Sequence, residues 1–446
     1  MKKILNTLFA LTLTLSSVNA ESINDALRDS SINNSAVSIS VKDVNSGKTV
    51  YELNSKKPMN PASTLKVVTL ASSLDELGKD YEFTTTLYKN TDDELLLKLG
   101  ADPFLTTIEL KSLLKTAREQ NIIEPKLVKV DDTILDKTEW GEGWQWDDDL
   151  NPLMPKFSAY NIDGNLLTIA VAPTSLGAPA EIKLTKFYPT TFMNLVTSSN
   201  DTNFKLSRNN NIAPDVLNIE GTVSKQTEMS FPVNYPRRYF MLRLEEAIRS
   251  AKIDYYGEIP LTKIQTEKSE IVAENKNSID LAIKSILHDS DNLVAETVFK
   301  LAGGHYSNKS GSAESGIEVL NNYCKKLGIN SEDIRVVDGS GVSKNNLVTS
   351  DFMTDFLVAQ YKNHPDYINC LASAGEGTLK NRMLYLNSKL KAKTGTLSDI
   401  SAITGYITTI SGKTYAFNIM INDAKSKSSD KKMLEEYIIR AINTSY

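Results

Sequence analysis

Hydrophobic and polar positions change their period several times along this chain of 446 residues, and these changes predict its secondary structure. Near the start, alternation over residues 36–42 and 49–53 predicts two strands, and the turn-forming residues 45–48 make them a hairpin. An apolar run over residues 67–74 then predicts a buried helix that ends near Gly78. The last third of the chain returns to strand periodicity, at residues 392–396, 402–408 and 414–421.

The middle of the chain mixes strands with helices and contains one β-rich stretch. Strands are predicted at residues 84–88, 95–99 and 127–130, around a helix at 107–120 whose leucines form one stripe. Residues 173–230 carry short polar and β-rich pieces without a helical period, which indicates a small inserted module. Further helices are predicted at residues 238–251, 278–287, 313–327 and 350–362.

An amphipathic helix is predicted at residues 431–442, close to the C-terminus. A helix of this kind can lie on a membrane surface or pack on the sheet of its own domain. Glu435 and Glu436 weaken the membrane interpretation. We therefore expect the helix to pack on the sheet.

Residues 1–20 have the composition of a secretory signal peptide. Lys2 and Lys3 precede a mostly apolar stretch, and residues 18–20 fit a cleavage site of small residues. The stretch is too short to span a bilayer, and no later segment is long and apolar enough to do so. The sequence predicts an exported protein without an integral membrane segment.

Charge and metal-binding residues exclude several classes of function. The net charge is −5, and cleavage after Ala20 would remove two lysines, so the chain lacks the basic surface of a nucleic-acid-binding protein. Cys324 and Cys370 are too few for a disulfide scaffold. They could pair, but two buried thiols are favoured. The three histidines have no ligand spacing, so neither a metal nor another cofactor is expected.

Ser63 and Lys66 are the first candidates for chemistry. A serine three residues before a lysine lies one helical turn away, on the same face. Burial would lower the lysine pKa and make a neutral amine available to take the serine proton. Alone, the Ser-x-x-Lys pattern is weak, because it occurs by chance in most chains and also fits a helix turn with a solvated lysine.

Two further tripeptides strengthen this hypothesis. Ser290-Asp291-Asn292 falls at a predicted turn between helices, and Lys393-Thr394-Gly395 opens a predicted strand. Ser-x-x-Lys, Ser-Asp-Asn and Lys-Thr-Gly in this order are the motif set of penicillin-binding proteins and class A β-lactamases. Each tripeptide is weak alone, but all three in order, each on the expected element, indicate an acyl-transfer site.

The residue types fit the chemical steps of acyl transfer. Ser63 would attack a carbonyl and form an acyl-enzyme, with Lys66 as the base. Ser290 could relay a proton to the leaving nitrogen, and whether Lys66 or a relay through Ser290 takes the first proton stays open. Asn292 would hold Lys66 and a substrate amide.

The Lys-Thr-Gly strand would bind the substrate. Lys393 supplies positive charge for a terminal carboxylate, and Thr394 or Thr396 can hydrogen-bond that carboxylate. Gly395 would let a substrate backbone lie against the strand edge, where a Cβ would clash. The backbone N–H groups of Ser63 and Thr396 are the expected oxyanion hole.

Residues 143–149 hold two of the three tryptophans beside three aspartates. A run of charges is usually a solvated loop. Aromatic bulk beside the charges is typical of an ordered loop on a surface that binds something. Spacing alone leaves both interpretations open.

These motifs give the chain a resemblance to a known family. It resembles the class C low-molecular-mass penicillin-binding proteins, the D-alanyl-D-alanine carboxypeptidase/endopeptidase family of serine peptidases. The resemblance covers essentially the whole mature chain. Besides the three motifs and residues 143–149, the matching segments are 100–103 (Gly-Ala-Asp-Pro), 157–159 (Phe-Ser-Ala), 338–343 (Asp-Gly-Ser-Gly-Val-Ser), 375–379 (Gly-Glu-Gly-Thr-Leu) and 405–406 (Gly-Tyr).

The resemblance implies a mixed α/β (α+β) fold. It places a penicillin-binding transpeptidase/β-lactamase-like sandwich domain at both chain ends, with a large inserted domain and a smaller β-rich domain nested in that insertion. The expected catalytic domain comprises residues 21–82 and 262–446, the inserted domain comprises 83–172 and 231–261, and the nested domain comprises 173–230. No function is carried over to the nested domain.

The implied activity is that of a periplasmic serine DD-peptidase. Such an enzyme removes terminal D-alanine from peptidoglycan stem peptides and is acylated by β-lactam antibiotics. Cleavage of the D-alanyl cross-link to diaminopimelate is a second activity of the family, and its balance with the first stays open, as does assembly into a homo-oligomer. Asp148 matches the family's acidic residue near the amino-bearing side chain of the substrate.

Two departures from the family pattern are modest. Lys344 stands where the family has an arginine, which puts a bidentate contact in doubt. Tyr160 and Asn161 follow Ser158-Ala159, where a proline is common.

A serine β-lactamase and a non-catalytic peptidoglycan-binding scaffold are the competing interpretations. A class A β-lactamase needs a glutamate between its second and third motifs to activate water. Residues 318–321 superficially resemble such a site but fall within a predicted helix. The long insertion between Ser63 and Ser290 also favours the peptidase, and the presence of every motif residue argues against a scaffold.

Overall fold

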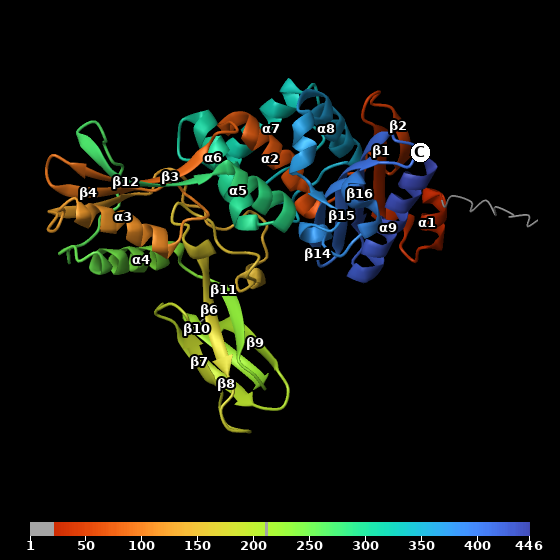
Figure 1. Ribbon diagram of the computed structural model, residues 1–446. Helices are drawn as coiled ribbons and strands as arrows, with labels where there is room; N and C mark the ends of the chain where they lie inside the picture. The colour runs from red at the N-terminus through yellow and green to blue at the C-terminus, as the bar shows by residue number, and fades with distance from the viewer. Residues whose placement is uncertain (1–21, 210–212) are drawn as a thin grey trace, which may run out of the picture.

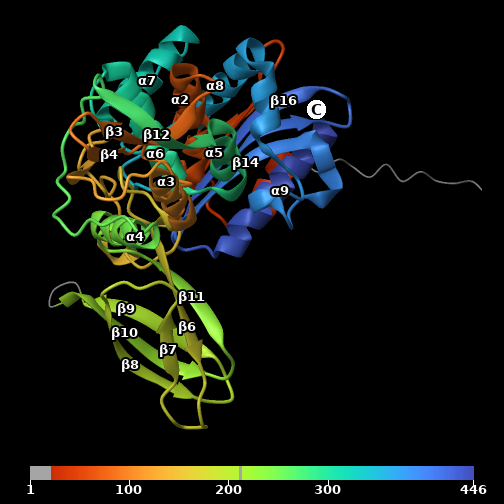
Figure 2. The ribbon, with the colours of Figure 1, turned by 60° about the vertical axis from the view of Figure 1, so that its left-hand side comes forward.

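The computed structural model describes residues 22–209 and 213–446, so the predicted signal peptide lies outside the described residues. Figure 1 shows two bodies side by side, each built on its own sheet. A smaller β-rich body projects away from both, as Figure 1 and the rotated view in Figure 2 agree.

The larger body is built on a six-stranded antiparallel sheet with the order β13-β14-β15-β16-β1-β2. The two ends of the chain meet in this sheet, because β1 pairs along its whole length with β16. The predicted hairpin β1–β2 is confirmed, and the predicted strands β15 and β16 pair as a second hairpin. The strands are β1 Val37–Asp43, β2 Thr49–Leu53, β13 Ala372–Ser373, β14 Leu390–Leu397, β15 Ile400–Thr408 and β16 Thr414–Asn422.

Helices cover both faces of this sheet, which explains why β15 and β16 are apolar on both sides (Figure 1). Phe417 and Ile419 of β16 point into a core with the terminal helices α1 and α9. Met420 points into the opposite core, which holds the other helices. The helices are α1 Ile23–Asp29, α2 Lys66–Leu77, α5 Ile279–Lys284, α6 Asn292–Ser307, α7 Ala313–Lys326, α8 Ser350–Asn363 and α9 Ser428–Ser445.

The C-terminal helix α9 packs on the sheet, as the sequence predicts. Its apolar stripe, including Ile438 and Ile442, is fully buried. Glu435 is buried too, where it accepts a hydrogen bond from Ser401 at 2.6 Å and pairs with Arg382 at 3.0 Å. Within the described part of the chain, no helix is both long and apolar enough to cross a membrane.

The second body contains a four-stranded sheet of order β12-β3-β4-β5, together with the helices α3 and α4. The expected domain boundary at residue 262 differs from this arrangement, because β12 pairs along the whole of β3. Its mostly polar residues suit an exposed edge strand. The elements are β3 Glu82–Asn90, β4 Glu94–Lys98, β5 Leu127–Asp131, β12 Ser269–Ser278, α3 Thr107–Glu119 and α4 Pro236–Ser250.

The β-rich body consists of two three-stranded sheets, β11-β6-β7 and β8-β10-β9. It begins at β6 rather than at the expected residue 173, since β6 pairs with both β7 and β11. A strand pattern is local and does not reveal which sheet the strand joins. The strands are β6 Leu166–Ala172, β7 Glu181–Leu184, β8 Thr191–Ser198, β9 Asn203–Asn209, β10 Ala213–Val223 and β11 Thr227–Pro232.

Two local features can be checked directly. The hydroxyls of Ser312 and Thr349 cap α7 and α8, a role that these residue types commonly fill. Cys324 is buried, Cys370 is half-buried, and both are free thiols, which is the favoured interpretation.

Candidate active site

Ser63 and Lys66 lie on one continuous helical segment, whose first turn packs against β14 and β15 of the six-stranded sheet. Ser63 belongs to the 3-10 turn Ala62–Leu65, and Lys66 is the first residue of α2. The Lys66 Nζ atom lies 2.9 Å from Ser63 Oγ. Ser63 is partly exposed and Lys66 is fully buried, so the pair presents a hydroxyl to solvent and keeps its amine inside.

The backbone just before Ser63 is strained. Ala62 has a φ of 46°, a value that residues with a Cβ rarely adopt. Its carbonyl oxygen packs against Gly341, where a Cβ would lie only 2.1 Å away. Such strain persists where the surrounding structure over-determines it, and here it fixes the direction in which Ser63 points.

The Lys66 amine faces three acceptors. It donates to Ser63 Oγ at 2.9 Å, to Asn292 Oδ1 at 2.6 Å and to the Ser340 carbonyl oxygen at 2.7 Å. An ammonium group satisfies all three with its three N–H bonds. If the proton that faces Ser63 leaves, the other two keep their acceptors and the lone pair points at Ser63 Oγ. The amine is therefore oriented to receive the Ser63 proton.

The environment of Lys66 also adjusts its basicity. Burial is the largest influence and lowers the pKa of Lys66 from 10.5 to about 8, against the opposite effects of Asp338, Glu296 and Asp291. A base whose pKa lies close to the working pH is well suited to general-base catalysis.

Asn292 opens α6 and faces Lys66, as predicted. Asp291, the N-cap residue, accepts a hydrogen bond from the Val294 amide at 3.1 Å and so fixes the start of the helix. The Asn292 Nδ2 atom donates to the Leu153 carbonyl oxygen at 2.7 Å. A substrate amide, the other predicted partner of Asn292, would therefore compete with Leu153.

Ser290 lies in a specialised turn between α5 and α6. The π-helical turn Ser285–Asp289 precedes it, and Ser290 itself has left-handed φ and ψ values of 65° and 31°. Short π-helical segments and strained residues concentrate at functional sites. The turn places Ser290 Oγ 2.8 Å from Lys393 Nζ, so the second and third motifs meet directly.

Lys393 is fully buried, which alters the role expected for it. Its Nζ donates to Ser290 Oγ at 2.8 Å and to the Thr394 carbonyl oxygen at 2.7 Å. Burial lowers the pKa of Lys393 well below 10.5, the nearby charge of Lys66 acts in the same direction, and Asp289 opposes both. The positive charge thus lies beneath the surface, which exposes hydroxyls of Ser290, Thr394 and Thr396 instead.

The structure shows a further reason for a glycine at position 395, which the sequence interpretation missed. A Cβ at this position would lie 2.8 Å from the Ser63 amide nitrogen and 3.0 Å from the Pro61 carbonyl oxygen. The glycine lets β14 lie directly against the turn that carries Ser63. Thr396, which follows Gly395, is thereby brought to the same turn, as expected for the second amide of an oxyanion hole.

Part of β14 also has unpaired backbone groups along one side. Among the described strands, β13 pairs with β14 only through Ala372 and Ser373, opposite Ala392 and Lys391. The strand from Lys393 onward therefore has a free side. An extended peptide can add to such an edge by main-chain hydrogen bonds.

The tryptophan-flanked acidic loop is ordered and reaches the site. Trp144 is buried, and its Nε1 donates to Asp338 at 2.9 Å, whereas Trp146 is 78% exposed. The loop continues to Leu153, which contacts Asn292. Of the two interpretations of residues 143–149, the structure supports an ordered loop at a surface beside the motifs.

Asp148 lies in the 3-10 turn Trp146–Asp148 of this loop and is half-buried. Burial and the neighbouring Asp147 raise the pKa of Asp148, and the nearby Lys344 acts against them. Lys344 pairs with Asp399, just beyond β14, at 3.4 Å. Asp148 and Asp399 thus both lie near Lys344, the position where the family pattern has an arginine.

Several residues of the site carry no role in the sequence interpretation. The segment 338–343 matches the family, but its contact with Lys66 through the Ser340 carbonyl is a backbone interaction that no residue type reveals. Glu296 accepts hydrogen bonds from that segment, and the spacing of four residues after Asn292 was its only signal. Thr378, in the matching segment 375–379, accepts from Thr394 Oγ1 at 2.7 Å.

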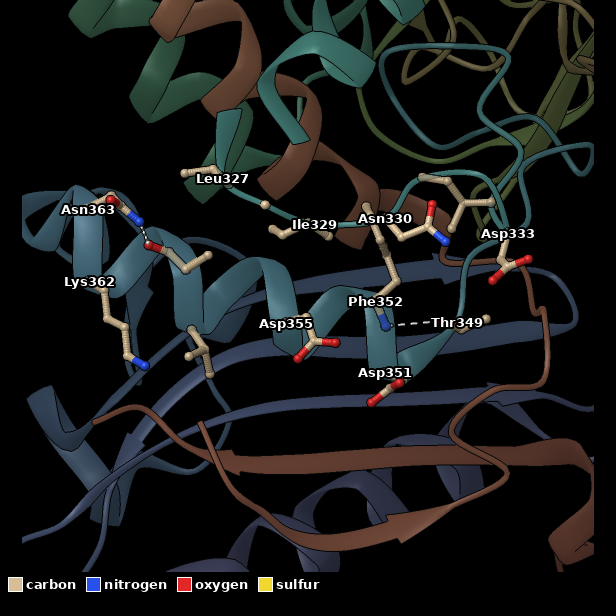
Figure 3. A pocket seen from close by; sticks show the side chains of 14 residues that line it. Leu327, Ile329, Asn330, Asp333, Thr349, Asp351, Phe352, Asp355, Lys362 and Asn363 are labelled. Atoms are coloured by element: carbon tan, nitrogen blue, oxygen red, sulfur yellow. Dashed lines mark hydrogen bonds between the residues drawn. The ribbon is translucent and has the colours of Figure 1, made fainter. Parts of the chain in front are cut away.

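Groups of possible metal ligands and the cavities of the molecule can be compared with the positions of the three motifs. Within residues 22–209 and 213–446, no three His, Cys, Asp or Glu side chains gather as metal ligands would. The cavity in Figure 3, about 450 Å³ in volume, lies between α8 and residues 327–334, and its lining includes none of the three motifs.

Comparison with known proteins identifies the family. The sequence matches the D-Ala-D-Ala carboxypeptidase 3 (S13) family over residues 19–440, nearly its whole length. The chain belongs to this family. The enzyme class expected from the motifs, a serine-type D-Ala-D-Ala carboxypeptidase, is thereby confirmed.

Relatives of the S13 family support the assignment along the full chain. D-alanyl-D-alanine carboxypeptidase DacB of Haemophilus influenzae is 24% identical over 443 residues, which cover 94% of this chain and 91% of the relative. The crystal structure of penicillin-binding protein 4 (dacB) from the same organism superposes with a TM-score of 0.82 at 24% identity, over 94% and 98% of the two chains. A second structure of that protein, complexed with a β-lactam, gives a TM-score of 0.77 at 22% identity, with the same coverage. The predicted fold class is confirmed.

Within this S13 fold, residues 318–321, which superficially resemble a β-lactamase signature, lie inside α7, where Val319 and Leu320 are buried in the core. Glu318 lies on α7 and is exposed. It is not among the residues that contact Ser63, Lys66 or Lys393.

Proposed function

We propose that this protein is a periplasmic DD-peptidase that removes terminal D-alanine from peptidoglycan stem peptides through an acyl-enzyme on Ser63. The observation that carries the proposal is the linked cluster around the two buried lysines. Lys66 joins Ser63 to Asn292, and Lys393 joins Ser290 to the part of β14 that has a free side. The three motifs therefore supply the nucleophile, the base, the proton relay and the charge for a substrate carboxylate.

Acylation would proceed in two steps. Ser63 passes its proton to neutral Lys66 as Oγ attacks the carbonyl of the penultimate D-alanine. The resulting oxyanion is stabilised by the backbone N–H groups of Ser63 and Thr396. Collapse of the tetrahedral intermediate breaks the peptide bond, and the leaving amine takes a proton through Ser290. Water then hydrolyses the ester and regenerates Ser63.

The terminal carboxylate would bind above Lys393. Ser290, Thr394 and Thr396 provide accessible hydroxyls, and the buried ammonium beneath them supplies the charge. A charge held in a low-dielectric site attracts an anion more strongly than the same charge in water. The preference would therefore be for peptides with a free C-terminus.

Cleavage of D-alanyl–diaminopimelate cross-links is a finer proposal that rests on Asp148. The acidic loop reaches the site through Leu153, and a carboxylate there would pair with a free side-chain amine of the substrate. Asp148→Ala should weaken turnover of peptides that carry this amine and spare those that lack it. Equal losses on both substrates would remove Asp148 from the role.

The predicted export would place the protein in the same compartment as its proposed substrate. Residues 1–20 fit a signal peptide, and peptidoglycan lies outside the cytoplasmic membrane. Cell fractionation with an antibody against the protein should find it in the periplasm, and a cytoplasmic pool of cleaved length would contradict export.

The decisive experiment is acylation by a fluorescent penicillin, followed by intact mass spectrometry. The structure of the Haemophilus influenzae relative with a β-lactam supports this choice of probe. We expect one stable adduct on the wild type and none on Ser63→Ala. Failure of the wild type to label, or labelling that survives the substitution, contradicts the proposal, and fast release of hydrolysed penicillin would instead indicate a β-lactamase. Purified muropeptide monomers and cross-linked dimers would then measure both peptidase activities at once.

A further inference from the structure

A short buried loop, residues 338–341, supplies one of the three acceptors of Lys66. The Ser340 carbonyl oxygen accepts from Lys66 Nζ at 2.7 Å. Without it, the neutral amine would lose one of the two acceptors that hold its N–H bonds away from Ser63. The position of this one backbone carbonyl therefore bears on the direction of the Lys66 lone pair.

Glu296 holds that loop from the side of α6. One carboxylate oxygen accepts from the Ser340 amide at 2.8 Å, and the other accepts from the Gly339 amide at 3.1 Å. The side chain is 1% exposed. Glu296 follows Asn292 by four residues, so one face of α6 reaches Lys66 twice, directly through Asn292 and indirectly through the loop.

Other contacts hold the same peptides from the remaining sides. Thr69 of α2 donates from Oγ1 to the Gly339 carbonyl oxygen at 2.7 Å. Asp338 accepts from the Gly341 amide at 2.8 Å. A Cβ on Gly339 would lie 2.5 Å from the Cβ of Phe299, which follows Glu296 on α6. Three side chains thus hold the loop, and among the described residues Glu296 is the one whose carboxylate accepts from two amides of residues 338–341.

We propose that Glu296 is a positioning residue for acylation: it holds the Gly339 and Ser340 amides so that the Ser340 carbonyl stays on Lys66 Nζ and the amine lone pair stays on Ser63. The inference rests on the proposed acyl-enzyme mechanism and adds to it a residue outside the three motifs. Glu296 touches neither Ser63 nor the Lys66 amine in this arrangement and acts through the loop.

The charge of Glu296 gives the proposal a second, independent readout. Asp338, Glu296 and Asp291 all face Lys66 and raise its pKa, whereas burial lowers it, and the positive charge of Lys393 lies nearby. Burial and the neighbouring Asp338 raise the pKa of Glu296 itself to about 7, so its negative charge is present above that pH. In that range, removing the charge of Glu296 should lower the pKa of Lys66. The pH at which acylation becomes fast should move down with it.

The test compares Glu296→Gln and Glu296→Asp by the rate constant of penicillin acylation at saturation, measured from pH 6 to pH 9. Glutamine keeps the length but presents an NH2 group to one of the two amides, so we expect a rate constant about 10- to 100-fold lower. Its loss of charge should also shift the rising limb of the profile of acylation rate against pH to lower pH. Aspartate keeps the charge but is too short to reach both amides, so we expect a slower rate with an unshifted limb.

Controls separate positioning from a general effect on folding. Labelling stoichiometry gives the fraction of folded sites, and Glu318→Gln on the exposed face of α7 should behave as the wild type. Thr69→Val removes a second hold on the loop without removing charge and should slow acylation several-fold. A wild-type rate constant or an unmoved limb in folded Glu296→Gln overturns the proposal. If that variant does not fold, wild-type rates in Glu296→Asp and Thr69→Val overturn it. A wild type that fails to label at all would refute the proposed function instead.

Discussion

The two buried lysines of the active site make the same first contact and yet have different surroundings. Lys66 donates to Ser63 at 2.9 Å and Lys393 donates to Ser290 at 2.8 Å, and both side chains are fully buried. Lys66 also has two further acceptors from α6 and the loop 338–341. Lys393 has only the carbonyl oxygen of its own neighbour, Thr394, besides the serine among the contacts of the described residues.

The charges around the two amines differ as well. Asp338, Glu296 and Asp291 partly offset the effect of burial on the pKa of Lys66, whereas Asp289 alone does so for Lys393. A base must exchange its proton and needs fixed acceptors for the hydrogens that it keeps. An anion-binding lysine gains its missing counter-charge from the substrate. We infer that the surroundings, rather than the shared serine contact, separate the two roles.

The largest effect should come from Lys66→Ala, which removes the base. We expect acylation by penicillin to fall by about a thousand-fold or more, since general-base catalysis contributes factors of this order. Stopped-flow labelling would measure the rate. Lys431→Ala is a matched control, because Lys431 is also fully buried but donates to the backbone carbonyl oxygen of Asp423 at 2.9 Å, on the loop before α9. Comparable acylation in both variants would contradict the assignment of Lys66.

Lys393→Ala should affect binding of the carboxylate more than the chemical step. A hydrogen bond that involves a charge contributes about 1.5–3 kcal/mol, so kcat/KM for a D-Ala-D-Ala peptide should fall roughly 10- to 150-fold. The same peptide with a C-terminal amide carries no charge there, and its slower turnover should change little. A similar loss on both peptides would show that Lys393 serves catalysis rather than carboxylate recognition.

The two lysines should also respond oppositely to pH. Below about 8, Lys66 is mostly an ammonium, so each unit of falling pH should reduce its neutral fraction, and the acylation rate, by about tenfold. Lys393 must keep its proton to attract an anion, so rising pH should raise KM for carboxylate peptides. Acylation rates and KM measured from pH 6 to pH 10 test both limbs. An acylation rate that does not change between pH 6 and pH 8 would rule out neutral Lys66 as the base.

The smallest effect is expected from Thr378→Val on the Lys393 side. Thr378 is exposed and accepts from Thr394 Oγ1 at 2.7 Å. When the Thr394 hydroxyl turns to donate to a carboxylate, the Thr378 hydroxyl can donate to Thr394 Oγ1 in return and hold it in place without touching the reacting atoms. We expect KM for D-Ala-D-Ala peptides to rise less than about tenfold, with kcat and thermal stability unchanged. Thr378→Ser, which keeps the hydroxyl, should restore the wild-type KM. A fall in kcat without a change in KM would contradict this assignment.

Local patterns in the sequence were sufficient to predict the chemical groups and the elements that carry them. The spacing of Ser63 and Lys66, the turn at Ser290 and the strand at Lys393 depend on neighbours a few residues away, and the structure has all three on those elements. The hydrophobic periods also predicted most helices and strands, including the packing of α9 on the sheet. Interactions of this range involve residues that are close together in the sequence, so a local sequence pattern is enough to predict them.

Contacts between distant segments were decided only by the tertiary structure. The pattern of β12 did not show that it joins β3, and Gly395 gave no sign that it lies against the Ser63 amide. The roles of Glu296 and the Ser340 carbonyl depend on how α6 meets a loop more than forty residues away. The sequence by itself determined which groups are available for acyl transfer. Packing decided how deeply each lysine is buried and which charges face it. Residue identity sets only the reference pKa, and burial and the distance to other charges shift the pKa from that value.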